Sequence, residues 1–167
     1  MDLIDAKFKK YPVRYLLQTS LATFTLLAFL LVLDVLHHTA ILAALGASTF
    51  VVFSMPGSYS AKAKSLVGGY IVGIASGCAF GFIHQSGCCV AVLASHHVSL
   101  ALFGGLAVGI SILIMVVTNT EHAPAAGMAL GLVLTQWNLR TIILIFSAVV
   151  ALAIARRALK PLLIDLI

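Results

Sequence analysis

Charged side chains are scarce in this chain: they make up 9% of its 167 residues, against about a quarter in an ordinary soluble domain. Hydrophobic residues account for 62% of the positions. A chain of this composition has too few polar side chains to cover itself with a water-compatible surface, so lipid is the solvent that it requires. The scarcity of charge excludes a soluble globular domain and predicts a multi-pass integral membrane protein.

Motifs for catalysis and cofactor binding are also lacking. The sequence contains no phosphate-binding loop, no dinucleotide fingerprint, no nucleophile elbow and no paired carboxylates. We therefore expect neither an enzyme nor a bound cofactor. His84, Cys88, Cys89, His96 and His97 form a cluster of metal-binding side-chain types, but their spacing matches no zinc pattern and no acidic residue supports them, so no metal site is predicted.

The net charge of +5 does not indicate nucleic-acid binding, because the basic residues flank apolar runs as membrane-orienting charges do. If the N-terminus is cytoplasmic, six crossings place segments 1–14, 54–65 and 156–167 on the cytoplasmic side, and only Arg140 falls elsewhere. The stretch 84–98 has neither Lys nor Arg, as expected of an outer loop. Both termini are predicted to be cytoplasmic. The nine cytoplasmic basic residues are Lys7, Lys9, Lys10, Arg14, Lys62, Lys64, Arg156, Arg157 and Lys160.

Apolar runs predict about six helices in an all-α bundle. A span takes roughly 20 helical residues, so the second run is borderline and the fifth, of about 12 residues or roughly 18 Å, does not reach across. The runs cover residues 15–33, 40–55, 66–83, 100–117, 123–134 and 141–155. We expect one transmembrane domain made of an N-terminal segment (1–14), a three-helix unit (15–83), an outer loop (84–99), a second three-helix unit (100–155) and a C-terminal segment (156–167).

The two three-helix units resemble each other weakly at an offset of 85 residues. In each, a long apolar helix ends in a short polar segment, and a short helix rich in Ala and Gly follows. Two units of three helices must have opposite topologies, which is the inverted-repeat architecture of many transporters; chance similarity is the alternative. The matched pairs are His37 with His122, Asp34 with Asn119, Ala40 with Ala125, and Gly46 with Gly131.

Ionisable residues gather at the entrances to the two short helices. Such groups are costly at membrane depth and persist mainly where they function, although helix ends at the headgroups would also carry them. The start of a helix has unpaired N–H groups and a partial positive charge, which favour a small anion, and Pro124 suits a first-turn position. We predict an anion site formed by His37, His38, Thr39, Ser48, Thr49, Asn119, Thr120, His122 and Gly127, with Asp34 and Glu121 as proton carriers.

Glycines recur every four residues in two of the predicted helices. Small residues at this spacing let helix backbones approach closely in lipid, within one chain or between copies. We therefore expect close helix packing, and self-association through these stripes. The stripes are Gly69, Gly73, Gly77 and Gly81, and Gly105 with Gly109.

Two passages resemble the HPP family of small integral membrane proteins, named for a His-Pro-Pro motif. The first is Leu45-Gly-Ala-Ser-Thr-Phe-Val-Val-Phe-Ser-Met-Pro56 with Lys64-Ser-Leu-Val-Gly-Gly-Tyr70, and the second runs from Leu106-Ala-Val-Gly to Thr118-Asn-Thr-Glu-His-Ala-Pro-Ala-Ala-Gly127. The resemblance covers roughly residues 12–155. It implies a transporter of the bacterial inner membrane or of plastid type, in a family associated with nitrite transport. The motif corresponds to His122-Ala123-Pro124, so its middle residue departs from the family pattern.

Three functions remain open from the sequence. The first is a transporter or channel for a small inorganic anion, with nitrite favoured. The second is a proton-coupled carrier of a cation or neutral solute that uses Asp34 and Glu121, because a carboxylate beside His122 is a poor neighbour for an anion. The third is a non-transporting membrane subunit that docks a partner through its glycine stripes.

Overall fold

The computed structural model describes residues 6–32, 39–86 and 95–167. These residues form α-helices and one 3-10 turn, and no strand occurs among them. The helices are α1 (Ala6–Lys10), α2 (Pro12–Val32), α3 (Thr39–Ser54), α4 (Ala63–Gln85), α5 (His96–Thr118), α6 (Ala123–Leu134) and α7 (Leu139–Leu159), followed by the turn η1 (Lys160–Leu162).

Four of these helices, α2, α4, α5 and α7, are long and apolar enough to cross a membrane. The prediction of an all-helical integral membrane protein is confirmed. The two short apolar helices are α3, with 16 residues, and α6, with 12. Helices α4 and α5 extend into the predicted outer loop, so His84 and His96 are helical. Hydropathy falls at these polar helix ends, although the backbone hydrogen bonding continues.

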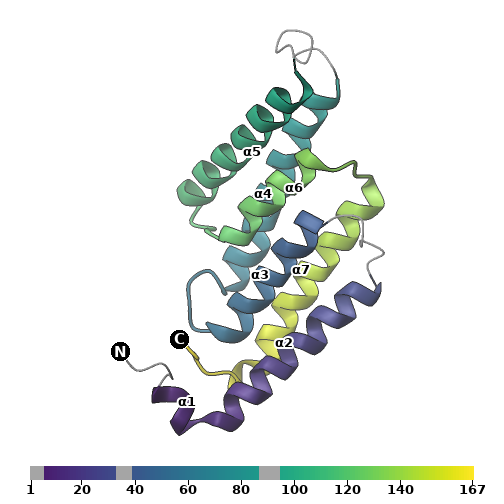
Figure 1. Cartoon of the computed structure of the whole chain (residues 1–167). Coiled ribbons are helices and arrows are strands. Elements are labelled where there is room, and N and C mark those ends of the chain that lie inside the picture. The colour runs from purple at the N-terminus through teal and green to yellow at the C-terminus, as the bar shows by residue number, and fades with distance from the viewer. Residues whose placement is uncertain (1–5, 33–38, 87–94) are drawn as a thin grey trace.

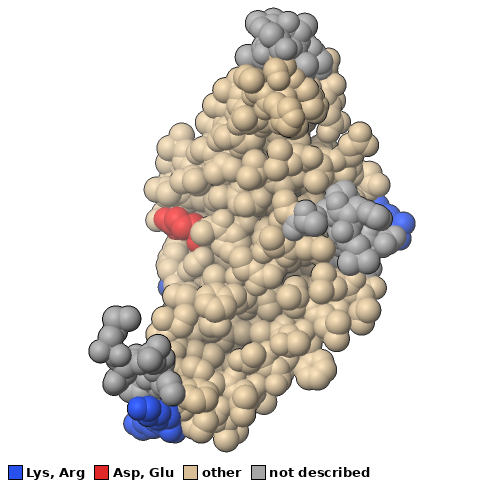
Figure 2. Space-filling view, in the orientation of Figure 1, with Lys and Arg blue, Asp and Glu red and all other residues tan. Residues whose placement is uncertain are grey.

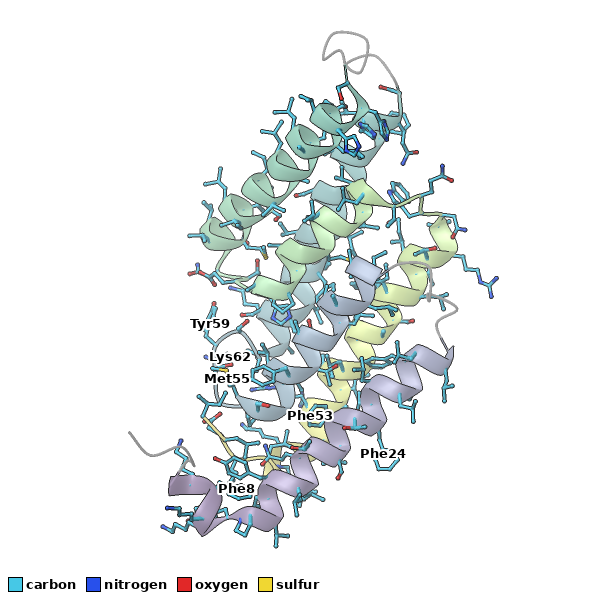
Figure 3. All side chains as sticks on the ribbon, in the orientation of Figure 1. Phe8, Phe24, Phe53, Met55, Tyr59 and Lys62 are labelled. Carbon is cyan, nitrogen blue, oxygen red and sulfur yellow. The ribbon has the colours of Figure 1, made fainter. Side chains whose placement is uncertain are left out.

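Helix α6 lies at the centre of the bundle (Figure 1). It packs against α3, α4 and α5, while α7 packs on α4 and α3. Helix α2 packs mainly on α3 and leaves most of its surface exposed, including Phe24, which points away from the bundle in Figure 3. Helix α6 is therefore the helix most enclosed by protein.

The glycine stripe of α4 is the surface on which α4 packs against α6. A Cβ atom added at Gly77 would lie 2.7 Å from the carbonyl oxygen of Ala129 and 2.9 Å from the Cβ of Leu132. One at Gly73 would meet the carbonyl of Ala125. The absence of side chains thus lets the two backbones touch, as small residues do between membrane helices.

Helix α6 begins and ends within the length of α4. Its N-terminal neighbour His122 lies against Gly69, six residues after α4 begins, and Leu132 lies against Gly81, four residues before α4 ends. At 1.5 Å per residue, these offsets are about 9 Å and about 6 Å. Because α4 is long enough to span a bilayer, α6 is contained within the length of a spanning helix and is shorter than it at both ends.

The two ends of the chain lie together. The Arg14 guanidinium donates to the carbonyl of Leu162 (2.7 Å), and the Tyr15 hydroxyl donates to that of Leu166 (2.6 Å). The buried Gln18 side chain donates to the carbonyls of Phe53 and Ile164 and accepts from the N–H of Ile164 (3.0 Å). Figure 1 shows α1 and the C-terminal segment at one end of the bundle.

We call this the basic end, defined by Arg14, Lys62, Lys64 and Arg156. Lys62 and Lys64 belong to it because the connection that precedes them is tied to the C-terminal segment: the N–H of Gly57 donates to the Asp165 carboxylate (2.8 Å). Figure 2 shows Lys and Arg only at the margins of a broad uncharged face. This distribution suits a protein whose sides contact lipid.

Candidate functional site

The start of α6 is shaped by a tight connection from α5. Asn119 ends α5 in the left-handed conformation (φ 52°), which asparagine adopts more readily than most residues. His122 then occupies the position before the first residue of α6, with extended backbone, and Pro124 lies in the first turn. This geometry turns the chain back into the bundle and sends the His122 ring inward, where it is 1% exposed.

The His122 ring is held by polar groups from three other elements. Its Nε2 lies 2.8 Å from the Ser48 hydroxyl of α3, which in turn lies 2.8 Å from the Tyr70 hydroxyl of α4. Its Nδ1 lies 2.9 Å from the carbonyl oxygen and 3.0 Å from the hydroxyl of Ser60, in the α3–α4 connection. We call these four residues (Ser48, Ser60, Tyr70 and His122) the polar site.

Hydrogen bonding in the polar site is complete with a neutral imidazole. If Nδ1 carries the proton, it donates to the Ser60 carbonyl, Ser48 donates to Nε2, and Tyr70 donates to Ser48. If Nε2 carries the proton, it donates to Ser48, which donates to the carbonyl of Ala44 (3.0 Å), and the Ser60 hydroxyl donates to Nδ1. Either tautomer of His122 therefore keeps the ring fixed.

Glu121 faces different surroundings from those of its neighbour. Glu121 is half-buried and lines a cavity of about 400 Å³ between α5 and α6, which is otherwise mainly apolar and opens at the exposed side chains of Ile112 and Val116. Its Oε2 atom is buried and has no hydrogen-bond partner. A buried polar atom without a hydrogen-bond partner is uncommon in folded proteins, so this oxygen is a candidate contact for a ligand. The lining residues are Ile112, Met115, Val116, Glu121, His122, Ala123 and Ala126.

Fewer backbone donors are available at this helix start than the sequence suggests. Pro124 has no N–H, and the N–H of Ala125 already donates to the carbonyl of His122 (2.9 Å). The helix dipole still places partial positive charge beside Glu121. The titratable pair Glu121 and His122 therefore dominates the chemistry of the α6 start.

Of the predicted anion-site residues, the structure brings Ser48 and His122 together. Ser60 and Tyr70 were not predicted from the sequence. A signal for Tyr70 was present, because a tyrosine inside a membrane helix needs a partner for its hydroxyl. Ser60 lies in a loop with two other hydroxyl residues nearby, and nothing local distinguishes it.

Four predicted residues lie outside the polar site. The Thr49 hydroxyl donates to the carbonyl of Leu45 in its own helix (2.9 Å), and Gly127 is exposed, so that a Cβ added there would have nothing within 4 Å. The Thr120 hydroxyl pairs with that of Thr118 (2.8 Å). Asn119 contributes its carbonyl, which accepts from a tyrosine of the α3–α4 connection.

Four of the predicted site residues precede or begin α3, where the structure does not describe their side chains. Asp34, His37 and His38 fall outside the described residues, and so does the side chain of Thr39. The described start of α3 lies near the other end of α6, because a Cβ at Gly131 would be 3.2 Å from the Cβ of Ala40. Helices α3 and α6 thus run side by side in opposite directions, and their N-termini do not converge on one anion.

The histidines of the predicted outer loop form a separate contact. The Nδ1 atom of His84 lies 2.7 Å from the Ser99 hydroxyl, and the His84 ring centroid is 4.9 Å from that of His96. His97 is exposed, and Cys88 and Cys89 fall outside the described residues. Within the described part of the chain, no group of three metal-binding side chains comes together.

The helical architecture and the histidine at the start of α6 agree with one known family. The model of the family described as "HPP, transmembrane region" matches residues 8–160. The chain belongs to this family. Comparisons with curated proteins and with solved structures give no match. The match to the HPP transmembrane region extends from α1 to the start of η1, so it includes every residue of the polar site and Glu121.

Proposed function

We propose that this HPP-family protein transports a small inorganic anion together with a proton, and that nitrite is its favoured substrate. The observation that carries the proposal is the unpartnered, buried carboxyl oxygen of Glu121 in a cavity at the start of α6. That start lies about 9 Å inside the length of a spanning helix. Ionisable groups at such depth are expected to take part in transport.

The carboxyl group and the helix start suit an anion that travels with a proton. An ionised Glu121 repels an anion, but a protonated Glu121 is neutral and donates an O–H hydrogen bond to it. The partial positive charge at the start of α6 then favours the bound anion. An anion that leaves with the Glu121 proton crosses the apolar interior without net charge, which removes most of the electrostatic barrier.

The polar site supports this function by holding the α6 start in place. His122 joins α6 to α3 and to the α3–α4 connection directly, and to α4 through Ser48 and Tyr70. A shift of any of these elements would therefore displace His122, which also lines the cavity. We propose the same positioning role for Ser48 and Tyr70.

A proton-coupled carrier of a cation or neutral solute is the second candidate, and the same observation favours it. An ionised Glu121 in an apolar cavity is a natural ligand for a small cation. Competition between solutes separates the two functions, because ammonium competes only in a cation carrier.

The family resemblance also bears on topology, location and assembly. We propose a bacterial inner-membrane location with both termini cytoplasmic, since nine of the ten basic residues lie in the segments 1–14, 54–65 and 156–167. The opposed directions of α3 and α6 favour an inverted repeat. A Cβ added at Gly105 or Gly109 would have nothing within 4 Å, so self-association through α5 remains our prediction. A transporting rather than an enzymatic role also remains a prediction.

A flux measurement tests the proposed function. Nitrite uptake into proteoliposomes would be compared for the wild-type protein, His122→Ala and His97→Ala, with protein-free liposomes as the baseline and chloride or ammonium as competitors. We expect His97→Ala to keep its flux, because this side chain is exposed far from α6, and His122→Ala to lose at least tenfold. Wild-type flux no higher than that of protein-free liposomes would refute transport of nitrite, and uptake of ammonium without uptake of nitrite would favour the cation carrier.

A further inference from the structure

The connection between α3 and α4, residues 55–62, covers the polar site from the basic end. We call it the α3–α4 loop; Figure 3 shows Met55, Tyr59 and Lys62 on it, together at one edge of the bundle. Its tip reaches the connection between α5 and α6 at two points. Ser60 contacts Nδ1 of His122 through both its carbonyl and its hydroxyl, and the Tyr59 hydroxyl donates to the carbonyl of Asn119 (2.7 Å).

The tip of the loop is a compact unit. Three consecutive turn hydrogen bonds stabilise it from within, namely the N–H of Ser58 to Met55 (3.0 Å), of Ala61 to Ser58 (3.3 Å) and of Lys62 to Tyr59 (3.0 Å). These bonds do not involve α6. The tip can therefore separate from α6 without losing its own conformation.

The base of the loop is attached elsewhere. The Arg156 guanidinium of α7 donates to the carbonyl of Pro56, and the Asp165 carboxylate accepts from the N–H of Gly57. The loop is thus fixed at its base to the C-terminal part of the chain, while its tip is joined to the α5–α6 connection by three polar contacts and rests on the bundle through the small, fully buried side chain of Ala61. This arrangement is that of a hinged flap.

We infer that the α3–α4 loop is a gate between the basic end and the polar site. The contacts of Tyr59 with Asn119 and of Ser60 with His122 keep it closed, and we call them the latch. The inference rests on the proposed function and adds the route by which solute reaches the site. When the tip lifts, Nδ1 of His122 and the carbonyl of Asn119 lose their partners and face the basic end. The Ser60 carbonyl accepts from a protonated Nδ1, and the Ser60 hydroxyl donates to an unprotonated Nδ1. Ser60 therefore bonds His122 in either tautomer.

Accessibility of a buried cysteine tests the gate without any solute. In a background with Cys78, Cys88 and Cys89 replaced by Ala, the reporter is Ser48→Cys, which lies behind His122 and is fully buried in the wild type. Thr120→Cys is a second reporter, in case the first perturbs folding. The measured quantity is the rate of modification by a membrane-impermeant thiol reagent, added in turn to each face of vesicles of known orientation.

The latch variant is Tyr59→Phe combined with His122→Phe, because the Ser60 carbonyl is backbone and would survive a change of Ser60 itself. The pair removes the bond to Asn119 and both Ser60 contacts while keeping a ring at position 122. The matched control is Ser58→Ala, whose hydroxyl bonds within the loop (3.3 Å to the N–H of Ala61). We expect the latch variant to raise the modification rate at least tenfold from the basic end only, and the control to leave it unchanged.

An unchanged rate in the latch variant would overturn the inference, and so would an equal rise in the control or from both faces. Because no nitrite is present, a failed gate and a failed transport function give separate results. Accessibility that responds to the latch in a protein that moves no nitrite would keep the gate and reject the substrate.

Discussion

Replacement of Gly77 by alanine tests the packing that positions α6. The added Cβ would lie 2.7 Å from the carbonyl oxygen of Ala129 and 2.9 Å from the Cβ of Leu132, so both backbones have to separate. Overpacking of this kind costs about 1–3 kcal/mol. Alanine also gains about 1 kcal/mol of helix propensity over glycine, which complicates any single measurement.

A matched variant removes that complication. Gly46→Ala makes the same change inside α3, where the new Cβ would have nothing within 4 Å. The propensity gain cancels in the comparison, so we expect Gly77→Ala to be less stable than Gly46→Ala by about 1–3 kcal/mol. The assay is reversible unfolding by a denaturing detergent in mixed micelles, followed by the fluorescence of Trp137, the single tryptophan. Equal stability of the two variants would refute close packing of α4 on α6.

Three further variants probe the polar site and the ends of the chain. Ser48→Ala leaves Nε2 of His122 and the Tyr70 hydroxyl without a shared partner and should lower the free energy of unfolding by about 1–3 kcal/mol in the same assay. Thr49→Val, which removes one hydroxyl bonded within α3, should lower it less. Equal losses of stability in the two variants would contradict the hydrogen-bond network of the polar site. Gln18→Leu removes three hydrogen bonds that tie α2 to α3 and to the C-terminal segment, so carboxypeptidase should trim residues 163–167 at least tenfold faster than in Thr19→Ala; resistance would show that other contacts hold the segment. Gly69→Ala would bring a Cβ within 2.7 Å of the Cβ of His122 and should lower nitrite flux more than Gly46→Ala, whose Cβ would have nothing within 4 Å. Similar flux in the two variants would show that transport does not depend on the position of His122.

The helices of this protein could be predicted well from the sequence, because lipid imposes strong rules on composition. The predicted run 123–134 coincides with α6, since Pro124 marks its first turn and a polar segment follows Leu134. The four-residue period of the α4 glycines likewise indicated a close helix contact, although it could not identify α6 as the partner. The ends of α4 and α5 were underestimated, because hydropathy measures solvent preference rather than backbone hydrogen bonding.

The candidate site could be predicted only in part. His122 and Ser48 were found because polar residues are rare in an apolar chain. The expectation that the starts of α3 and α6 converge depended on how two helices lie relative to each other, and local sequence contains no such information. Ser60 reaches His122 from 62 residues away, in a loop whose other hydroxyl groups look equivalent. Long-range pairings of this kind come from the packing of the whole bundle.

Proton-coupled nitrite uptake tests the central claim most directly. The initial rate would be measured in proteoliposomes with and without an imposed pH gradient, for the wild-type protein and Glu121→Gln, after subtraction of the rate in protein-free liposomes. Glutamine preserves the shape of the side chain but cannot release a proton. We predict that the pH gradient stimulates the wild-type rate and that Glu121→Gln abolishes this stimulation, while nitrite exchange at equal pH persists. A full response to the gradient in folded Glu121→Gln protein would contradict the account.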